Sequence, residues 1–503
     1  MAPRHPLGVV RLCVAEAFER FSYYTMAAVL VLFLAGSTAH GGFGWKDADA
    51  IAYYGTYVGL LWLMPLFGGW AADRWTGARR AVLGGALSIS IGQLLMAGPA
   101  LLPTLVGFFT GVPVERVLAS AAVPLGELRP SAAVMAQLQQ AAVLAYPANG
   151  TAAFEAARMA YTLSAIAFPL GLALLAIGVG FLKPNITVML GNRYASDDPH
   201  RDRGFTLFYV AINVGGVLAG LVAGLVAERI GWSFGFLLAA VAMAIGFVIL
   251  ATSDALRDDA ASVVAREPAR PASDATPRLP RGPLLYVLAM TAAAVVFWGA
   301  YMQSGGVLNL FIYNRVDREI FGFVVPAAWL FVLTPAFVVL FGLGFQSVLD
   351  RYSARRGEID TIWRFAGGLV LAAIAFLILT AASAAGAPTD LVAIFWPVLI
   401  YLILAIAELS LSPAGNAMAA RYVPPSIAGR MMAIWFLCYA GGSVLSGYLG
   451  VLATRLGMPT MLAGTAALLL LAAAVLIVMR RPLNAWIGAR GETPRGVAVQ
   501  TPR

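Results

Sequence analysis

Residues 16–24 read EAFERFSYY, and they place three charged side chains inside an apolar stretch that is long enough to cross a membrane. On a helix these charges share one face with the two tyrosines, because the spacings from the first glutamate are three, four, seven and eight residues. Each ionised side chain near the bilayer centre costs about 2.5–3.5 kcal/mol. The face is therefore stable only if it points into a protein interior or a water-filled cavity.

The alternative is a helix end at the membrane surface, where Glu16 and Arg20 would reach water. Only a short lead, 1–6, precedes the apolar stretch. A helix that starts near Leu7 would carry Glu16 about 15 Å along its axis. That depth favours the interior position.

The chain as a whole is strongly apolar. Of its 503 residues, 60% are hydrophobic and 12% are charged, whereas soluble domains average about 25% charged residues. The sequence therefore predicts an all-α membrane protein surrounded by lipids. The net charge of +9 does not indicate a nucleic-acid partner, because the basic residues cluster in short loops between apolar segments.

Apolar windows of about 20 residues recur twelve times and predict twelve transmembrane helices. We place them near 11–35, 50–72, 79–102, 160–190, 204–228, 232–253, 283–313, 321–348, 363–385, 389–417, 427–455 and 459–480.

Two long intervals interrupt the spans. Residues 254–282 are rich in Pro, Arg, Asp and Ser, which predicts a linker between an N-terminal six-helix bundle, 1–253, and a C-terminal one, 283–480. Residues 103–159 form an insertion on the external side. We expect one or two amphipathic helices there, lying over the external mouth, and the alternative is a span with a re-entrant segment.

The basic loops predict the orientation. The Arg-rich loops at 73–80, 193–203 and 351–364 fall on the same side as the tail, 481–503. By the positive-inside rule that side is cytoplasmic, so both termini and the linker are expected in the cytoplasm. High Ala, Gly and Arg usage is consistent with a bacterial inner (cell) membrane.

No catalytic or metal-binding constellation stands out. Cys13 and Cys438 fall in apolar spans, and His5, His40 and His200 lie in the lead or in loops. An enzyme would need a metal or nucleophile cluster that the spans do not offer. We therefore expect no enzyme activity, no metal and no cofactor, and any proton carried within the membrane would have to use a carboxylate.

Further polar residues lie inside predicted spans: Lys183 in the fourth, Asn213 in the fifth and Glu408 in the tenth. Arg20 and Lys183 come from one half and Glu408 from the other, so a zwitterion could bridge the halves. The alternative is a salt bridge between Lys183 and Glu408 that only holds the bundle shut. Four aromatic residues would line the pocket, although each tryptophan alone could instead pack against lipid: Tyr24, Trp62, Trp298 and Trp435.

Two resemblances follow from the motifs. The loop at 69–80, GWAADRWTGARR, matches the signature of the major facilitator superfamily, with a weak echo at 350–356. The motif at 16–24 matches the first-helix motif of the proton-dependent oligopeptide transporter (POT) family at every fixed position. The resemblance continues through 183–185, 205–215, 297–303, 325–329, 408–413 and 432–437.

The resemblance implies a role for each matching residue. Glu16 and Glu19 look like the protonatable pair of the first helix, with Arg20 as their partner. Arg20 and Lys183 look like the site for the peptide C-terminus, and Glu408 like the site for the peptide N-terminus and a third proton site. The remaining matches look like a side-chain pocket wall and peptide-backbone contacts, namely Trp435 for the wall and Tyr24 and Asn213 for the backbone.

The chain also departs from the family. Met302 replaces a glutamate that usually pairs with an arginine of the first helix, where this chain has Ala27. Losing both partners avoids a stranded buried charge, so the external gate would close by packing Ala27 against Met302. Trp62 stands where a substrate-contacting tyrosine is common, and Thr334 replaces an asparagine.

We therefore predict a monomeric transporter that imports di- and tripeptides with protons by alternating access. A first alternative is the same fold with another solute, such as an anion or a non-peptide metabolite, and weak or no proton coupling. A second is a receptor that binds peptide without transporting it.

Overall fold

The computed structural model describes residues 7–121, 123, 130–194, 198, 200–253, 281–357, 359–385, 390–421 and 425–488. Most of them are helical. The helices of the N-terminal half are α1 (Leu7–Ala35), α2 (Asp47–Ala71), α3 (Ala78–Met96), α4 (Gly98–Thr110), α5 (Val114–Ala121), α6 (Ala132–Ala145), α7 (Gly150–Gly191), α8 (Arg201–Leu218), α9 (Gly224–Arg229) and α10 (Trp232–Ala251).

The C-terminal half continues the pattern. Its helices are α12 (Arg281–Tyr301), α13 (Val307–Arg315), α14 (Ala327–Phe331), α15 (Leu333–Arg356), α16 (Thr361–Ala384), α17 (Phe395–Arg421), α18 (Pro425–Leu456), α19 (Met458–Val478) and α20 (Arg480–Gly488). Single turns of π-helix at Ala72–Thr76 and Ala219–Ala223 and 3-10 turns at Thr38–His40 and Met302–Ser304 join or extend them.

Twelve spans can be counted among the described residues. Ten helical segments are long and apolar enough to cross a membrane, and two bent pairs complete the set. One pair is α3 with α4, bent by 65°, and the other is Ala327–Gly342 with Gly344–Arg356, bent by 45°. The third span, which the sequence placed at 79–102, therefore bends after Met96.

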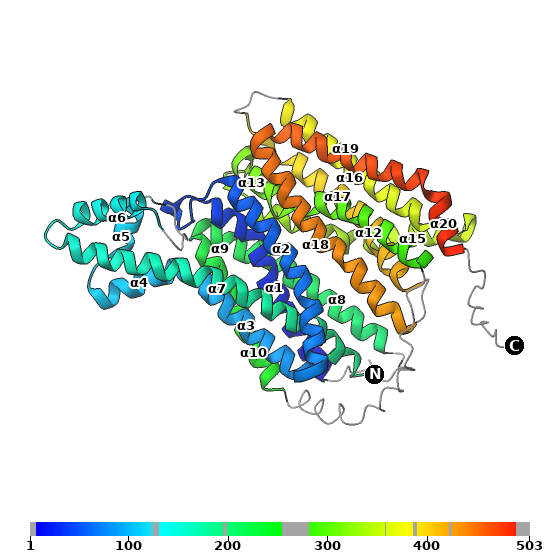
Figure 1. The fold of residues 1–503 in the computed structure, drawn as a ribbon, viewed down its shortest axis with the longest axis horizontal. Coiled ribbons are helices and arrows are strands. Elements are labelled where there is room, and N and C mark those ends of the chain that lie inside the picture. Colours follow the sequence, from blue (N-terminus) through cyan, green and yellow to red (C-terminus); the bar gives the residue numbers. More distant parts are fainter. Residues whose placement is uncertain are drawn as a thin grey trace.

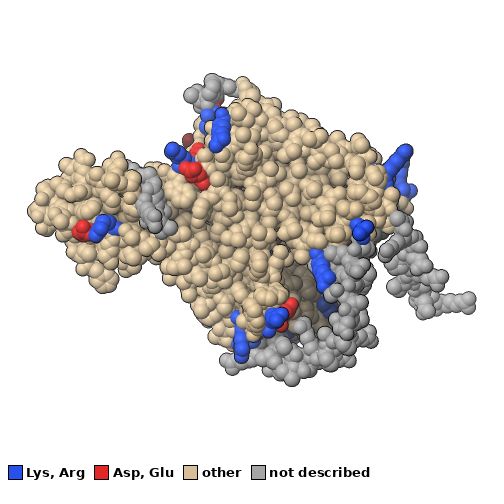
Figure 2. All heavy atoms as spheres, viewed as in Figure 1, with Lys and Arg blue, Asp and Glu red and all other residues tan. Residues whose placement is uncertain are grey.

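The two halves lie side by side, with α1 to α10 on one side of the molecule and α12 to α20 on the other (Figure 1). Glycines let helices approach closely within the N-terminal half. A methyl group added at Gly85 of α3 would lie 2.7 Å from the Gly178 carbonyl oxygen of α7. Charged side chains gather toward the two ends of the bundles, and a broad surface between them shows none on this face (Figure 2).

The prediction for the start of the eighth span was wrong. Residues 321–326 are not helical, because β2 (Glu319–Ile320) and β3 (Phe323–Val324) pair as an antiparallel hairpin. Its turn uses Phe321 and Gly322, whose φ angles are +50° and +80°. A second short pair is parallel, between β1 (Val316–Asp317) and β4 (Val392–Ala393).

The insertion at 103–159 is helical and stands out from the N-terminal half. It consists of the end of α4, α5, α6 and the start of α7, a helix of 42 residues that continues into the fourth span. These helices pack around a small apolar core of their own, which includes Val106, Val117 and Leu138. The insertion projects sideways instead of covering the junction between the halves, so the predicted lid over the external mouth is not found (Figure 1).

Both predicted polar segments fall largely outside the described residues. The linker predicted at 254–282 is described only at 281–282, where α12 begins. The predicted tail, 481–503, starts as the helix α20, which ends at Gly488. Asp360 anchors α20, because its carboxylate accepts hydrogen bonds from Arg480 Nε at 3.0 Å and from Asn484 Nδ2 at 2.9 Å.

The halves are joined at the predicted external end. Asn309 Nδ2 of α13 donates to the Ala28 carbonyl of α1 at 2.7 Å. Arg318 Nη1 lies 2.8 Å from Glu228 Oε2 of α9. The backbones of α2 and α18 are also in close contact, at Gly55 of α2 and Gly447 of α18. These contacts close that end of the junction in this structure.

Candidate binding site

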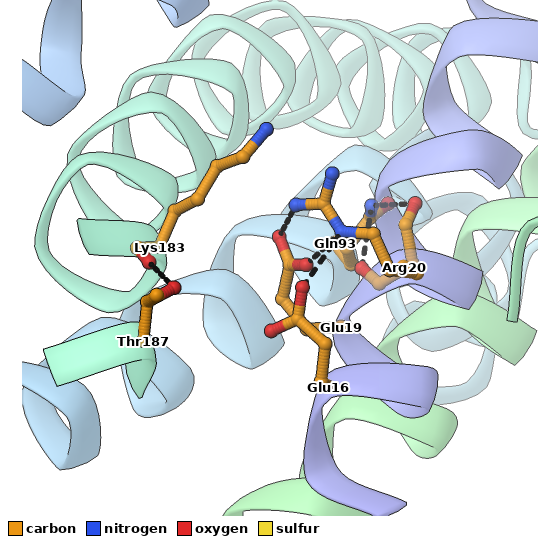
Figure 3. A network of polar contacts seen from close by, with 7 residues as sticks. Glu16, Glu19, Arg20, Gln93, Lys183 and Thr187 are labelled. Atoms are coloured by element: carbon orange, nitrogen blue, oxygen red, sulfur yellow. Dashed lines mark hydrogen bonds and ion pairs between the residues drawn. The ribbon is translucent and has the colours of Figure 1, made fainter. Parts of the chain in front are cut away.

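The charged face of α1 is buried inside the N-terminal half. Glu16, Glu19 and Arg20 are 2%, 1% and 4% exposed. The Arg20 guanidinium makes a two-donor contact with the carboxylate of Glu19. Arg20 Nη2 donates to Glu19 Oε1 at 2.6 Å, and Arg20 Nε donates to Glu19 Oε2 (Figure 3). Arg20 Nε also lies 3.5 Å from Glu16 Oε1. The planar fork of Arg20 is thus already occupied by a carboxylate of its own helix.

Local packing explains how this face can be buried. Gly215 of α8 lies against it, and a methyl group there would be 2.9 Å from Arg20 Cβ. Gln93 of α3 reaches α1 from another side and donates to the Ser22 carbonyl oxygen at 3.0 Å. Close helix approach therefore shields the charges from lipid.

Lys183 is placed differently from Arg20. Its ammonium lies 4.5 Å from the ring centroid of Trp62 in α2 and 5.9 Å from that of Tyr23. In the described part of the chain no carboxylate lies within ion-pair distance of it. Figure 3 shows the Lys183 side chain extending apart from the glutamates. The cation is therefore held by aromatic faces and is open to an anion.

Glu408 supplies negative charge from the C-terminal half. It lies in α17 and hydrogen-bonds to Tyr301 of α12, while its Oε2 atom is buried without a hydrogen-bond partner. An unpartnered buried carboxylate oxygen is costly, so this atom is poised to accept a donor from a ligand.

These charges meet at one cavity of about 500 Å³ between the halves. Glu16, Arg20 and Lys183 line it from one half and Glu408 from the other. Nine of the remaining lining residues are aromatic, and these are Tyr23, Tyr24, Tyr54, Trp62, Tyr209, Trp298, Tyr301, Phe331 and Tyr439. A cavity with cations on one side, a carboxylate on the other and rings between them suits a small zwitterion.

A row of rings crosses from one half to the other along this wall. Trp62 stacks on Tyr439 of α18, with centroids 4.6 Å apart and planes 21° apart. Tyr439 also contacts Trp298 of α12 at 4.4 Å, and Trp298 contacts Tyr301 at 4.9 Å. The row thus leads from the ring that holds Lys183 to the tyrosine bonded to Glu408.

Most residues singled out in the sequence reach the cavity, and some do not. Tyr24, Ala27, Trp62, Trp298, Met302 and Thr334 line it with the four charges.

The others are not among the residues that line the cavity. Glu19 is bonded to Arg20, and Asn213 Nδ2 donates to the Tyr209 carbonyl of its own helix at 2.8 Å. Trp435 is fully buried and donates from Nε1 to Asn416 Oδ1 at 2.8 Å. In this structure Trp435 therefore orients Asn416, which lines the cavity, instead of lining it itself.

Sequence reasoning missed Tyr301, Asn416 and Tyr439. A signal existed for one of them, because Tyr439 follows Trp435 by four residues and so shares its helix face. Tyr301 could have been found from its position beside Met302. Nothing in the local sequence points to Asn416.

Comparison with known proteins supports the resemblance of the motifs. A family model described as the POT family matches residues 81–258 and 280–460. A peptide transporter of Yersinia enterocolitica is 26% identical over 95% of this chain and 95% of its own. An uncharacterized transporter of Bacillus subtilis is 26% identical over 95% and 94%. A di-/tripeptide transporter of Lactococcus lactis is 24% identical over 96% and 97%.

Solved structures show the same architecture. A peptide transporter POT in complex with sulfate matches with a TM-score of 0.73, 23% identity and 96% coverage of both chains. A POT family transporter in complex with 5-aminolevulinic acid matches with a TM-score of 0.72 and 21% identity, covering 95% of this chain and 97% of the other. The predicted all-α fold, with twelve spans in two bundles of the major facilitator type, is confirmed.

Proposed function

Because the chain belongs to the POT family, we propose that it imports di- and tripeptides together with protons by alternating access. One observation carries this proposal: Lys183 from one half and Glu408 from the other line a single cavity. A peptide has a carboxylate and an ammonium at opposite ends. Its carboxylate would face Lys183 and its ammonium would face Glu408, so that one ligand contacts both halves.

Proton coupling is proposed to act through Arg20. The guanidinium now bonds to Glu19. Protonation of Glu19 would neutralise the carboxylate that binds the Arg20 guanidinium. The guanidinium could then bind the peptide carboxylate instead. Loss of that proton would restore the ion pair and weaken the hold on peptide. Glu16 and Glu408 are the further carboxylates that could bind protons in this scheme.

The closed junction supports alternating access. The halves are tied at the predicted external end by Asn309 and by the Glu228–Arg318 pair. We propose that this end faces outward and that both termini lie in the cytoplasm of a bacterial cell. A tag on either terminus should then be protected from protease in intact cells and cleaved after lysis; cleavage in intact cells would contradict the orientation. We also propose that one copy suffices for transport.

Uptake into liposomes tests the proposed function. Purified protein should take up a labelled dipeptide faster with an inward proton gradient than without one, and a protonophore should abolish the difference. Equal initial rates would contradict proton coupling, and no uptake under either condition would contradict peptide transport.

Variants of the cavity test its role. Lys183→Ala and Glu408→Ala should each abolish gradient-driven uptake, because the first removes the cation that is available to the peptide carboxylate and the second removes the carboxylate that faces the peptide ammonium. Glu155→Gln is a matched control, since Glu155 is 52% exposed and paired with Arg158 in the insertion. Unchanged transport by either cavity variant would remove that residue from the site.

A second candidate is a single amino acid-like zwitterion with weak or no proton coupling. A related structure holds 5-aminolevulinic acid, and the uncharged pair Ala27 and Met302 lines the cavity here. Competition separates the candidates. Dipeptides should inhibit uptake at lower concentration than single amino acids if peptides are the substrate.

A further inference from the structure

We propose that Trp62 is the positioning residue for carboxylate binding: it holds the Lys183 ammonium in the cavity and ties that lysine to the C-terminal half through Tyr439. This inference rests on the proposed function, because it assigns the anion contact of the same site.

The two cations of the site are not equivalent. Arg20 is engaged by Glu19 through two donors and approached by Glu16. Lys183 has no such carboxylate partner in the described part of the chain. An incoming carboxylate therefore meets Lys183 as the available cation, while Arg20 must first be released. What fixes Lys183 then decides how well the carboxylate binds.

Trp62 is the group that fixes it. The ammonium lies 4.5 Å from the Trp62 centroid, closer than its 5.9 Å to Tyr23. Tryptophan is the best aromatic partner for a cation, and the attraction grows where water is excluded. A long lysine side chain is otherwise flexible. The indole thus holds the ammonium in one place and leaves its charge unneutralised. A carboxylate partner would neutralise that charge.

The same ring belongs to a contact between the halves. Trp62 stacks on Tyr439 of the opposite half at 4.6 Å. The helices that carry them come together at Gly59 of α2, where an added methyl would lie 3.2 Å from the Ala440 carbonyl oxygen of α18. The stack therefore forms when α2 and α18 lie together, and the lysine is set in place in that same arrangement.

Trp62 also brings an unused donor. Its Nε1 atom is buried and has no hydrogen-bond partner. Leaving such a donor unsatisfied is unfavourable, and the cavity beside it is where a ligand oxygen would lie. A tyrosine at this position would offer a hydroxyl but a smaller face to the lysine.

A spectroscopic test needs no substrate. The chain has two lysines, Lys46 and Lys183. In a Lys46→Arg protein, reductive methylation with ¹³C-formaldehyde labels Lys183, and the N-terminal amine gives a separate signal. Ring currents should move the Lys183 methyl resonance away from the position of free dimethyl-lysine.

In this background Trp62→Leu should remove most of the displacement and leave only the part due to Tyr23, and Trp62→Phe should keep an intermediate displacement. The proposal would be overturned if the parent resonance is not displaced, or if Trp62→Leu leaves the displacement unchanged. This readout also does not depend on what the protein transports.

Binding provides the second test, with Ala-Ala and its C-terminal amide as probes. Trp62→Leu should weaken binding of the dipeptide about tenfold, while the amide, which lacks a carboxylate, should change less than about twofold. Trp62→Phe should stay within about threefold of the parent. In a Lys183→Ala background, Trp62→Leu should have no further effect on the dipeptide.

The outcomes separate the two proposals. Equal losses for dipeptide and amide, or equal losses for Trp62→Leu and Trp62→Phe, would overturn the role of Trp62. A parent protein that binds neither probe would contradict the proposed function, and the methyl resonance would then still decide whether Trp62 holds Lys183.

Discussion

The buried pair Glu19 and Arg20 shows how one residue can control the site. Both side chains are almost fully buried, and each satisfies the other through a two-donor contact. Removing one partner of a buried ion pair normally costs about 3–5 kcal/mol, because the remaining charge is stranded. Here Glu16 lies 3.5 Å from Arg20 and would still compensate part of that charge.

Glu19→Gln imitates the protonated glutamate and gives the prediction at this scale. The guanidinium should become available to the peptide carboxylate at any pH, so gradient-driven uptake should be lost. Exchange of labelled for unlabelled dipeptide across the membrane needs no proton release and should persist. Both are measured in the same liposomes, with Glu155→Gln as the control. Gradient-driven uptake at the parent rate would show that Glu19 does not couple the proton.

Helix packing within the N-terminal half is the first feature at the scale of elements. Gly85 and Gly84 are neighbours in α3 but face different surroundings. A methyl group at Gly85 would lie 2.7 Å from the Gly178 carbonyl oxygen and 2.8 Å from the Leu182 amide nitrogen, both backbone atoms of α7. A methyl group at Gly84 would meet nothing within 4 Å.

Gly85→Ala should therefore destabilise the protein and Gly84→Ala should not. Backbone atoms cannot rotate away, so overpacking at Gly85 should cost about 1–3 kcal/mol. At Gly84 the change should be neutral or stabilising, since alanine is favoured over glycine in a helix by up to about 1 kcal/mol. Thermal unfolding in detergent measures both. Equal melting temperatures for the two variants would contradict the close contact of α3 with α7.

A second element, α20, depends on the charge of Asp360. Burial alone would raise the pKa of this carboxyl, but hydrogen bonds from Asn484, the Ile362 amide and Arg480 outweigh it, and the pKa lies below its usual value. A group with a lowered pKa contributes its stability above the unfolded pKa of about 3.9 and loses it as the pH falls through the folded value. The attachment of α20 should therefore hold at neutral pH and weaken in acid.

Hydrogen exchange in α20 measures this attachment. In the parent protein the protection of 480–488 should decline only as the pH falls below the unfolded pKa of about 3.9 toward the lowered pKa of Asp360. Asp360→Asn should show the low protection at pH 7, because an amide lacks the charge that holds Arg480, yet it can still cap α16. Asp360→Ala should also loosen the first turn of α16. Protection that is the same in all three proteins would contradict the anchoring role.

The elements could largely be predicted from the sequence, and the site only in part. Apolar windows predict the spans because length and hydrophobicity suffice, and the charged face of α1 could be placed inside because charge in lipid is costly. The hairpin at 319–324 was missed, since apolar residues there read as the start of a span. The stack of Trp62 on Tyr439 could not be predicted, because the two rings belong to different halves and meet only through tertiary packing.

At the scale of the whole molecule, a largely buried ion pair joins the two halves at the predicted external end. Ala27 and Met302 cannot attract each other by charge. Instead, Glu228 of α9 accepts from Arg318 at 2.8 Å and also from the amide of Ala327. Both side chains of this pair are 10% exposed. Because this ion pair is largely shielded from water and joins the two halves, it should stabilise the conformation in which the predicted external end is closed.

Breaking that pair should open the predicted external end more often. Glu228→Gln leaves Arg318 with a weaker partner, so a cavity residue should become accessible from outside. With Cys13 and Cys438 replaced by serine, Ser304→Cys reports on the cavity that Ser304 lines. Its labelling by a membrane-impermeant maleimide in intact cells should rise several-fold with Glu228→Gln and stay unchanged with Glu155→Gln. Arg318→Met should have the same effect, since either substitution removes the ion pair between Glu228 and Arg318. If neither variant changes the labelling rate, the apolar packing around Ala27 and Met302 closes this end without help from charge.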